Sequence, residues 1–357
     1  MRFEFIKFTL TVASLAVFST HCVAQDASPP DYPFALTACG GELRTLRWST
    51  DSGALVAATV ALPTETQRYG FEALKGQRLI LGRSCTKNQE QFVPAVLSNG
   101  EGVLLILNEK TGARSVLRIG SPFMFLGVAF LGAEPVVHGG KGEAGYIAKL
   151  ERRGGEWLLS DEVKISETNV ITSVGTVGGV RFAAGLVPDK GRPMLNVFPL
   201  TETLARADTG RRLPCGPSFA DAIKDRIVVL CAAQFSLSKP GLLVHKISSN
   251  FRDITTEYLP TTNTTGFVSS ACEGNELNSF AFVGVSPNLS LILTTMPITG
   301  AALKSIVFDY QIVMPPPQGI DCIRKSPRGY FVTNALRLAT RMSLPPLQSL
   351  LRLVEID

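Results

Sequence analysis

Charged and aromatic side chains are scarce in this chain of 357 residues: Asp, Glu, Lys and Arg make up 18% of it, and Trp, Tyr and Phe 8%. The formal net charge of +5 is dispersed, without any cluster of five or more lysines and arginines. This excludes the dense basic surface by which proteins bind nucleic acids. Beyond residue 24 the sequence also lacks an apolar run of the roughly 20 residues with which a helix spans a bilayer. We therefore expect neither a nucleic-acid partner nor a membrane span in that part of the chain.

Histidine is rarer still, since only His138 and His245 lie beyond residue 24. Two histidines are too few for a histidine-based metal site, and no G-x-S-x-G motif marks a nucleophilic serine. No pair of cysteines has the C-x-x-C spacing of zinc sites. The sequence therefore assigns no catalytic residue, and we expect no metal and no cofactor.

The first 24 residues have the features of a signal peptide. Arg2 and Lys7 form a basic start, Phe8 to Ser19 is apolar, and small residues precede Gln25. The apolar run is about half the length that a membrane-spanning helix needs, which favours a cleaved signal over an uncleaved anchor. We expect residues 1–24 to be a signal peptide, residues 25–357 to form a single domain, and the protein to be secreted or periplasmic.

Short apolar runs punctuated by glycine are abundant in the remainder. In residues 168–205, two runs rich in Val, Ile and Phe meet at Gly178-Gly179, and a turn at Pro188 to Gly191 leads into a third run. No helical periodicity of useful length is present. This pattern is typical of consecutive antiparallel strands.

The same unit recurs along the chain. A strand, a polar tip ending in glycine and a second apolar strand are found around Gly53, Gly112, Gly155 and Gly300, with weaker turns near Thr203, Asn250 and Pro345-Pro346. The intervals of about 43 to 59 residues, with four strands in each, are typical of β-propeller blades. The sequence therefore predicts an all-β, seven-bladed propeller of four-stranded antiparallel blades. We expect the first blade to contribute only two or three strands. Six or eight blades, a pair of sandwiches and a β-helix remain as alternatives.

Two segments resemble known propeller families. LLILNEKTGARSVLRI, residues 104–119, resembles a blade of bacterial periplasmic quinoprotein-like propellers, which share the strand, D/N-x-x-T-G turn and strand pattern. WSTDSGALV, residues 48–56, is similar to the Asp-box turn of sialidase-type propellers, with Val56 in place of the aromatic residue. Each resemblance covers one blade and implies the propeller fold, without an activity.

Six cysteines remain after the signal peptide, and an even number in an exported protein favours disulfides. They are Cys39, Cys85, Cys215, Cys231, Cys272 and Cys322. Cys215 and Cys231 flank a predicted hairpin and are placed to bridge its open end. Cys39–Cys85 and Cys272–Cys322 would tie neighbouring blades together. Buried free thiols are the alternative, and six cysteines allow 15 pairings.

The loops between the second and third strands of each blade, together with the links between blades, form the expected ligand-binding face. The candidate residues are His138, Lys141, Glu143, Asp189, Lys190, Arg192 and Lys239. Gly140 to Gly145 also fits G-x-G-x-x-G, but a strand-like run follows it where a dinucleotide site requires a helix. We expect a non-enzymatic binding or scaffold module for a protein or glycan partner. A glycan-active hydrolase or lyase on the same fold is the alternative.

Overall fold

The structure is a computed structural model. It describes residues 33–36, 44–59, 66–189, 192–215, 218, 220–223, 225–232, 241–260, 272–273, 279–285, 290–297, 304–311, 330–337 and 348–354. Side chains are described for residues 46–57, 67–189 and 194–258, except 216–217, 219, 224 and 232–242. The predicted signal peptide, together with Cys39, Lys190, Lys239 and Cys322, lies outside the described residues.

The described strands group into antiparallel sheets of strands that follow one another in the chain. The first sheet contains β1 (Pro33–Leu36), β2 (Arg44–Ser49), β3 (Ala54–Thr59) and β4 (Thr66–Gly70). After the 3-10 helix η1 (Glu72–Leu74), the second contains β5 (Leu79–Leu81), β6 (Cys85–Lys87), β7 (Glu90–Leu97), β8 (Gly102–Asn108) and β9 (Arg114–Gly120). The third contains β10 (Phe123–Leu131), β11 (Glu134–Lys141), β12 (Ala144–Arg153) and β13 (Glu156–Ile165). The fourth contains β14 (Val170–Val177), β15 (Val180–Asp189), β16 (Arg192–Pro199) and β17 (Arg211–Leu213).

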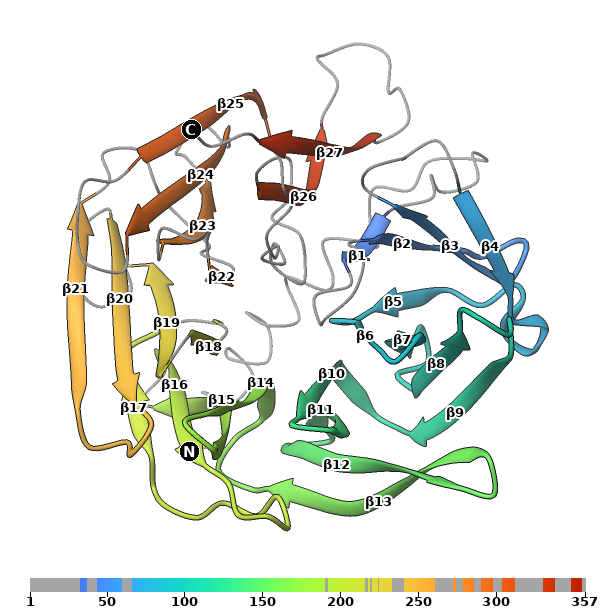
Figure 1. Cartoon of the computed structure of the whole chain (residues 1–357), viewed down its shortest axis with the longest axis horizontal. Coiled ribbons are helices and arrows are strands. Elements are labelled where there is room, and N and C mark those ends of the chain that lie inside the picture. Colours follow the sequence, from blue (N-terminus) through green and yellow to red (C-terminus); the bar gives the residue numbers. More distant parts are fainter. Residues whose placement is uncertain are drawn as a thin grey trace, which may run out of the picture.

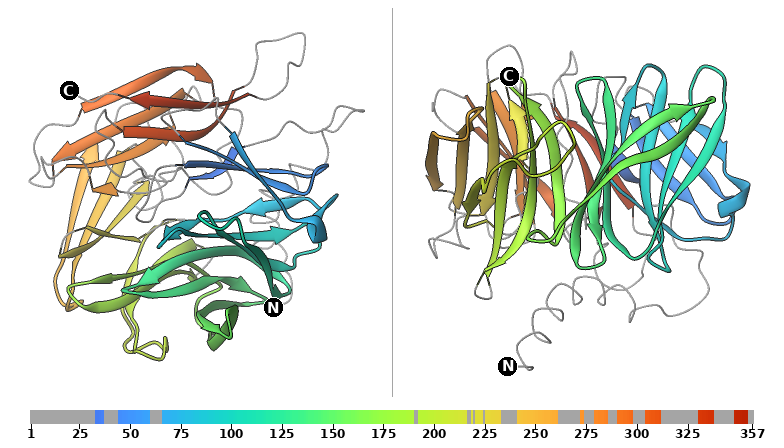
Figure 2. Two further views of the ribbon diagram at one scale, coloured as in Figure 1. Left: turned by 45° about the vertical axis from the view of Figure 1, so that its right-hand side comes forward. Right: turned by 90° about the horizontal axis from the view of Figure 1, so that it is seen from below.

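Three further sheets complete the described part of the chain. The fifth contains β18 (Ala220–Ile223), β19 (Arg226–Ala232), β20 (Gly241–Ser248) and β21 (Ile254–Pro260). The sixth contains β22 (Cys272–Glu273), β23 (Ser279–Val285), β24 (Ser290–Pro297) and β25 (Lys304–Gln311). The last contains β26 (Tyr330–Arg337) and β27 (Gln348–Val354). Figure 1 shows these sheets following one another around a common centre, with the first strand of each sheet innermost, and Figure 2 shows them standing side by side.

The expectation of an incomplete first blade is wrong, because the first sheet has four strands. The unforeseen strand is β4, with the sequence TQRYG. It is the outermost strand of its sheet and is mostly exposed, so it has no reason to carry the apolar pattern that marks the other strands.

The predicted hairpins are present where local turn chemistry specifies them. Gly178 and Gly179 both have positive φ and connect β14 to β15, with Val177 opposite Val180. Gly53 has a φ of 59° between β2 and β3, and a Cβ there would lie 2.7 Å from the Lys75 Cα. Glycine is required at such a position both by the backbone conformation and by the close approach of another segment.

Apolar cores lie between successive sheets rather than within one central core. Val103 and Leu105 of β8 pack toward the first sheet, whereas Leu104 and Ile106 of the same strand pack toward the third. Similar clusters join the third sheet to the fourth and the fourth to the fifth. Both faces of a sheet are buried in this way, which explains why the strands are almost continuously apolar. Among the described elements, no helix has the length and hydropathy needed to cross a membrane.

Candidate binding site

Lys141 and Glu143 lie at the turn that connects β11 and β12, between the second and third strands of the third sheet as predicted. Glu143 is exposed at the tip. Lys141 is partly buried: its Nζ lies 3.2 Å from the Glu162 Oε1 and 4.8 Å from the centre of the Tyr146 ring. The Lys141 ammonium is therefore occupied by contacts within its own sheet.

His138 lies within a strand, and the expectation that it belongs to a ligand-binding loop is wrong. It lies within β11, is 2% exposed, and its Nδ1 donates a hydrogen bond to the Ile171 carbonyl over 3.0 Å. Burial lowers the pKa of His138 from 6.5 to about 4. The neighbouring Gly139 serves close packing within the sheet, since a Cβ there would lie 1.9 Å from the Phe125 carbonyl oxygen. Gly139 therefore meets a packing requirement and does not mark a turn.

Asp189 ends β15 and is half-buried, opposite Arg192 at the start of β16. The side chain of Arg192 lies outside the described part. Within the described residues, no hydrogen bond or ion pair joins Asp189 to Glu143. The structure thus places these two candidates on separate turns, each between the second and third strands of its sheet.

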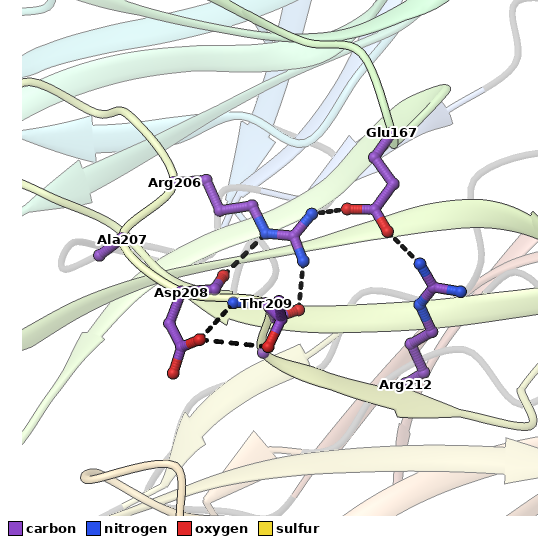
Figure 3. Close-up of a pocket in the computed structure, with 7 residues that line it drawn as sticks. Glu167, Arg206, Ala207, Asp208, Thr209 and Arg212 are labelled. Atoms are coloured by element: carbon purple, nitrogen blue, oxygen red, sulfur yellow. Dashed lines mark hydrogen bonds and ion pairs between the residues drawn. The ribbon is translucent and has the colours of Figure 1, made fainter.

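A pocket of about 630 Å³ lies elsewhere, beside the connection between β16 and β17 (Figure 3). We call it the Glu167 pocket. Its lining residues are Glu167, Arg206, Ala207, Asp208, Thr209, Gly210 and Arg212. Glu167 comes from the segment between β13 and β14, and the others come from the β16–β17 connection and β17. The pocket therefore combines the connection between two sheets with a loop of the fourth sheet.

The loop over residues 200–210 is held in shape by its own side chains. Leu204 is fully buried in the core between the third and fourth sheets, with a φ of 64°. The Arg206 Nε donates to the Asp208 carbonyl over 2.7 Å, and its Nη2 donates to the Thr209 carbonyl. The Arg206 guanidinium also lies 5.2 Å from the centre of the Phe198 ring. These contacts hold the Arg206 side chain in one position.

Glu167 bridges the two arginines of the pocket: its carboxylate forms an ion pair with Arg206 and another with Arg212 (Figure 3). Burial, and then the neighbouring Arg212 charge, lower the pKa of Arg206. The Arg212 side chain is 49% exposed. Among the described residues, only its Nη2 has a partner, the Glu167 carboxylate. Arg212 therefore keeps donors for a ligand, whereas the donors of Arg206 are committed to Glu167 and the loop.

Asp208 adds a second carboxylate to the lining of the Glu167 pocket. One carboxylate oxygen, Oδ1, accepts hydrogen bonds from the backbone amide and the hydroxyl of Thr209. With two arginines and two carboxylates, the formal charges of the pocket cancel. A site that presents a guanidinium and a carboxylate side by side can bind a ligand that carries both hydroxyl groups and a negative charge. The sequence marked only a weak turn near Thr203, and the Arg-Ala-Asp-Thr-Gly run was the available signal for this loop.

A second charged arrangement involves the innermost strands. The Arg83 Nη2, between β5 and β6, lies 3.6 Å from the Asp221 Oδ1 in β18. Both side chains are largely buried. Nearby, the Thr172 hydroxyl donates to the Ser218 carbonyl over 2.8 Å, joining the fourth sheet to the segment before β18. Nothing in the sequence indicates that Arg83 and Asp221 meet, because 137 residues separate them.

The predicted Cys215–Cys231 disulfide is confirmed, with a Cα–Cα distance of 5.2 Å. It joins the segment after β17 to β19 and so ties the fourth sheet to the fifth. Cys85 is also disulfide-bonded. Its predicted partner Cys39 lies outside the described residues, as do Cys322 and the side chain of Cys272.

No protein-family model and no curated protein matches this chain. Solved structures do match it. A structure from a study of two prolyl endopeptidases has a TM-score of 0.53 at 8% identity, covering 84% of this chain and 45% of its own. A mutant of puromycin hydrolase has a TM-score of 0.51 at 11% identity, covering 85% and 50%. Raptor from Chaetomium thermophilum has a TM-score of 0.51 at 11% identity, covering 86% and 27%.

The fold is β-propeller-like. The matched structures are β-propeller-containing proteins, and the described sheets of this chain have the four-stranded antiparallel order of propeller blades. The chain spans half or less of the length of each of these proteins. At 8 to 11% identity the likeness concerns the fold alone.

Proposed function

We propose that this chain is an exported β-propeller that binds an anionic glycan in the Glu167 pocket and does not transform it. The proposed ring has seven blades, one for each sheet of the described part. Contact between β1 and β26 supports closure of the ring between the first and last sheets. The basic and apolar composition of residues 1–24 and the Cys215–Cys231 disulfide support export.

One observation supports the binding proposal most directly. The Arg206 side chain is held in one position by its contacts, whereas the Arg212 guanidinium is partly exposed to solvent in the pocket. Arg206 and Glu167 hold each other in place, and Glu167 also fixes the orientation of Arg212. A half-exposed guanidinium that is already oriented loses little conformational freedom when a carboxylate binds to its open edge. The carboxylate of Asp208 can accept hydrogen bonds from the hydroxyl groups of the same ligand.

The size of the pocket favours a glycan over a protein as its occupant. A volume of about 630 Å³ lies within the range of roughly 300 to 1,000 Å³ that is typical of small-ligand sites. A stable protein partner would instead cover about 800 Å² on this chain. An acidic sugar with one or two neighbours fits the pocket in size, and its carboxylate can pair with the open edge of the Arg212 guanidinium.

Calorimetric titration with uronic-acid oligosaccharides and their neutral counterparts tests the proposal. The acidic sugars should bind more tightly, and Arg212→Gln should weaken their binding by about tenfold or more, as expected for the loss of a charged hydrogen bond. Arg118→Gln is the matched control. Arg118 is also half-exposed and lies 2.7 Å from a carboxylate, that of Glu101, outside the pocket.

Two results would contradict the proposal. Equal binding by wild type and Arg212→Gln would show that the pocket is not the site. Cleavage of the oligosaccharides by the purified protein, lost in Glu167→Gln or Asp208→Asn, would favour the alternative of a glycan hydrolase or lyase.

A further inference from the structure

Two cysteines and a histidine from three different segments meet in the core between the fourth and fifth sheets. Cys215 follows β17, Cys231 lies in β19 and His245 lies in β20. Their two sulfur atoms and one imidazole nitrogen all lie within 4.8 Å of one another, and all three residues are buried. In the structure the two sulfurs form a disulfide.

One ring nitrogen of His245 lacks a hydrogen-bond partner among the described residues. Its Nδ1 lies 2.9 Å from the Thr256 hydroxyl in β21. Its Nε2 has no hydrogen-bond partner within the part of the chain whose side chains are described, although the residue is only 3% exposed. Buried polar atoms without a partner are rare and usually have a specific reason. When Nδ1 carries the proton and donates it to Thr256, Nε2 has a free lone pair, which is the form in which histidine binds metals.

We propose that reduction of the Cys215–Cys231 disulfide creates a Zn²⁺ site formed by Cys215, Cys231 and His245. A two-electron reductant, a dithiol or a phosphine, breaks the S–S bond, and each sulfur gains one electron and one proton. Zn²⁺ then replaces both thiol protons, which are released, and binds the two thiolates and the imidazole. This inference is independent of the proposed glycan binding.

The chemistry of the three groups favours zinc. Thiolate and imidazole are the usual ligands of Zn²⁺, and three protein ligands leave a fourth position for water. Zinc–ligand bonds of about 2.0 to 2.3 Å place tetrahedral ligand atoms roughly 3.5 to 4 Å apart, which is within the 4.8 Å of this cluster. The two thiolate charges balance the charge of the ion, so the site is neutral. Neutrality matters because an unbalanced charge is very unfavourable in an apolar core.

Such a site would preserve the link between the fourth and fifth sheets under reducing conditions. The disulfide already joins Cys215, at the end of the fourth sheet, to β19 of the fifth. A zinc ion held by the same sulfurs and by β20 would connect the same segments without the S–S bond. In the sequence 15 residues lie between the two cysteines and 13 between Cys231 and His245, and this spacing is unlike that of common zinc motifs.

Zinc binding to the reduced protein tests the proposal. Purified wild type is treated with a phosphine reductant, and its thiols are alkylated with and without one equivalent of Zn²⁺ before mass spectrometry assigns each cysteine. We expect Zn²⁺ to slow alkylation of Cys215 and Cys231 by about tenfold or more, and to raise the melting temperature of the reduced protein. The oxidised protein should show neither effect.

His245→Gln should abolish the protection, and His138→Gln, which changes the other buried histidine, should retain it. Should His245→Gln fail to fold, the absorption spectrum of Co²⁺ bound to reduced wild type tests ligation by the two cysteines, because thiolate ligation produces charge-transfer bands. Protection confined to other cysteines, undiminished protection in His245→Gln, or a Co²⁺ spectrum without thiolate bands would overturn the proposal.

Discussion

Arg83 and Asp221 lie 3.6 Å apart at their closest charged atoms, although two complete sheets separate them along the chain. Their side chains are only 15% and 21% exposed. An ion pair that is largely removed from water is screened less than a surface pair. The pair therefore connects the second sheet directly to the fifth, whereas the apolar cores described above connect successive sheets.

The energetic coupling of this pair can be measured with a double-mutant cycle of Arg83→Met and Asp221→Asn. We expect a coupling free energy of about 1 kcal/mol or more in urea unfolding, because the two charges are close and poorly solvated. The exposed Arg118–Glu101 pair serves as the comparison and should show a smaller value. Additive effects of the two changes at Arg83 and Asp221 would show that the contact has no energetic role.

Gly127→Ala should destabilise the protein by about 1 to 3 kcal/mol, because a Cβ there would lie 2.6 Å from the Cε1 of the His138 ring. The ring cannot move away without losing its hydrogen bond to the Ile171 carbonyl. Gly70→Ala is the control, since its Cβ would meet nothing closer than 3.8 Å. Thermal or urea unfolding measures both variants, and equal stability of the two would contradict the steric argument.

Acid should destabilise the folded protein through its buried histidines. Burial lowers the pKa of His138 from 6.5 to about 4, and that of His245 likewise to about 4. The unfolded chain therefore binds more protons than the folded chain between these pH values. The free energy of unfolding is therefore highest above pH 6.5. It falls as the pH drops toward 4, by up to about 1.4 kcal/mol per pH unit for each histidine.

Urea unfolding at several pH values between 7 and 4.5 tests this expectation. His138→Gln should reduce the slope of stability against pH, since one of the two titrating groups is removed. Carboxylates also titrate at the lower end, so the informative quantity is the difference between variant and wild type. Identical slopes would contradict the assignment.

Arg206→Leu should loosen the loop over residues 200–210, because the guanidinium donates to the carbonyls of Asp208 and Thr209 and pairs with Glu167. We expect a loss of about 1 to 3 kcal/mol and faster amide hydrogen exchange within this loop. Arg153→Leu is the control, because Arg153 is 69% exposed and, among the described residues, forms an ion pair only with the nearby Glu151. Unchanged exchange in residues 200–210 would show that Leu204, rather than Arg206, holds the loop.

Much of the local architecture was predictable from the sequence. The hairpin at Gly178-Gly179, the β11–β12 turn and the Cys215–Cys231 bridge all depend on residues close together in the chain. Glycine, turn residues and alternating or continuous apolar runs act over such short separations. The strand β4 was missed because an exposed outermost strand needs no apolar pattern.

The groups of residues at the candidate sites, in contrast, depend on how the sheets pack against one another. The pairing of apolar strands into hairpins follows from the sequence alone, because it depends on residues that are neighbours in the chain. Only the tertiary structure brought Glu167 to Arg206, Arg83 to Asp221 and His245 to the two cysteines. Each of these groups joins different sheets or the connections between them. Their meeting depends on the packing angle and spacing of the sheets, and no local periodicity encodes these quantities.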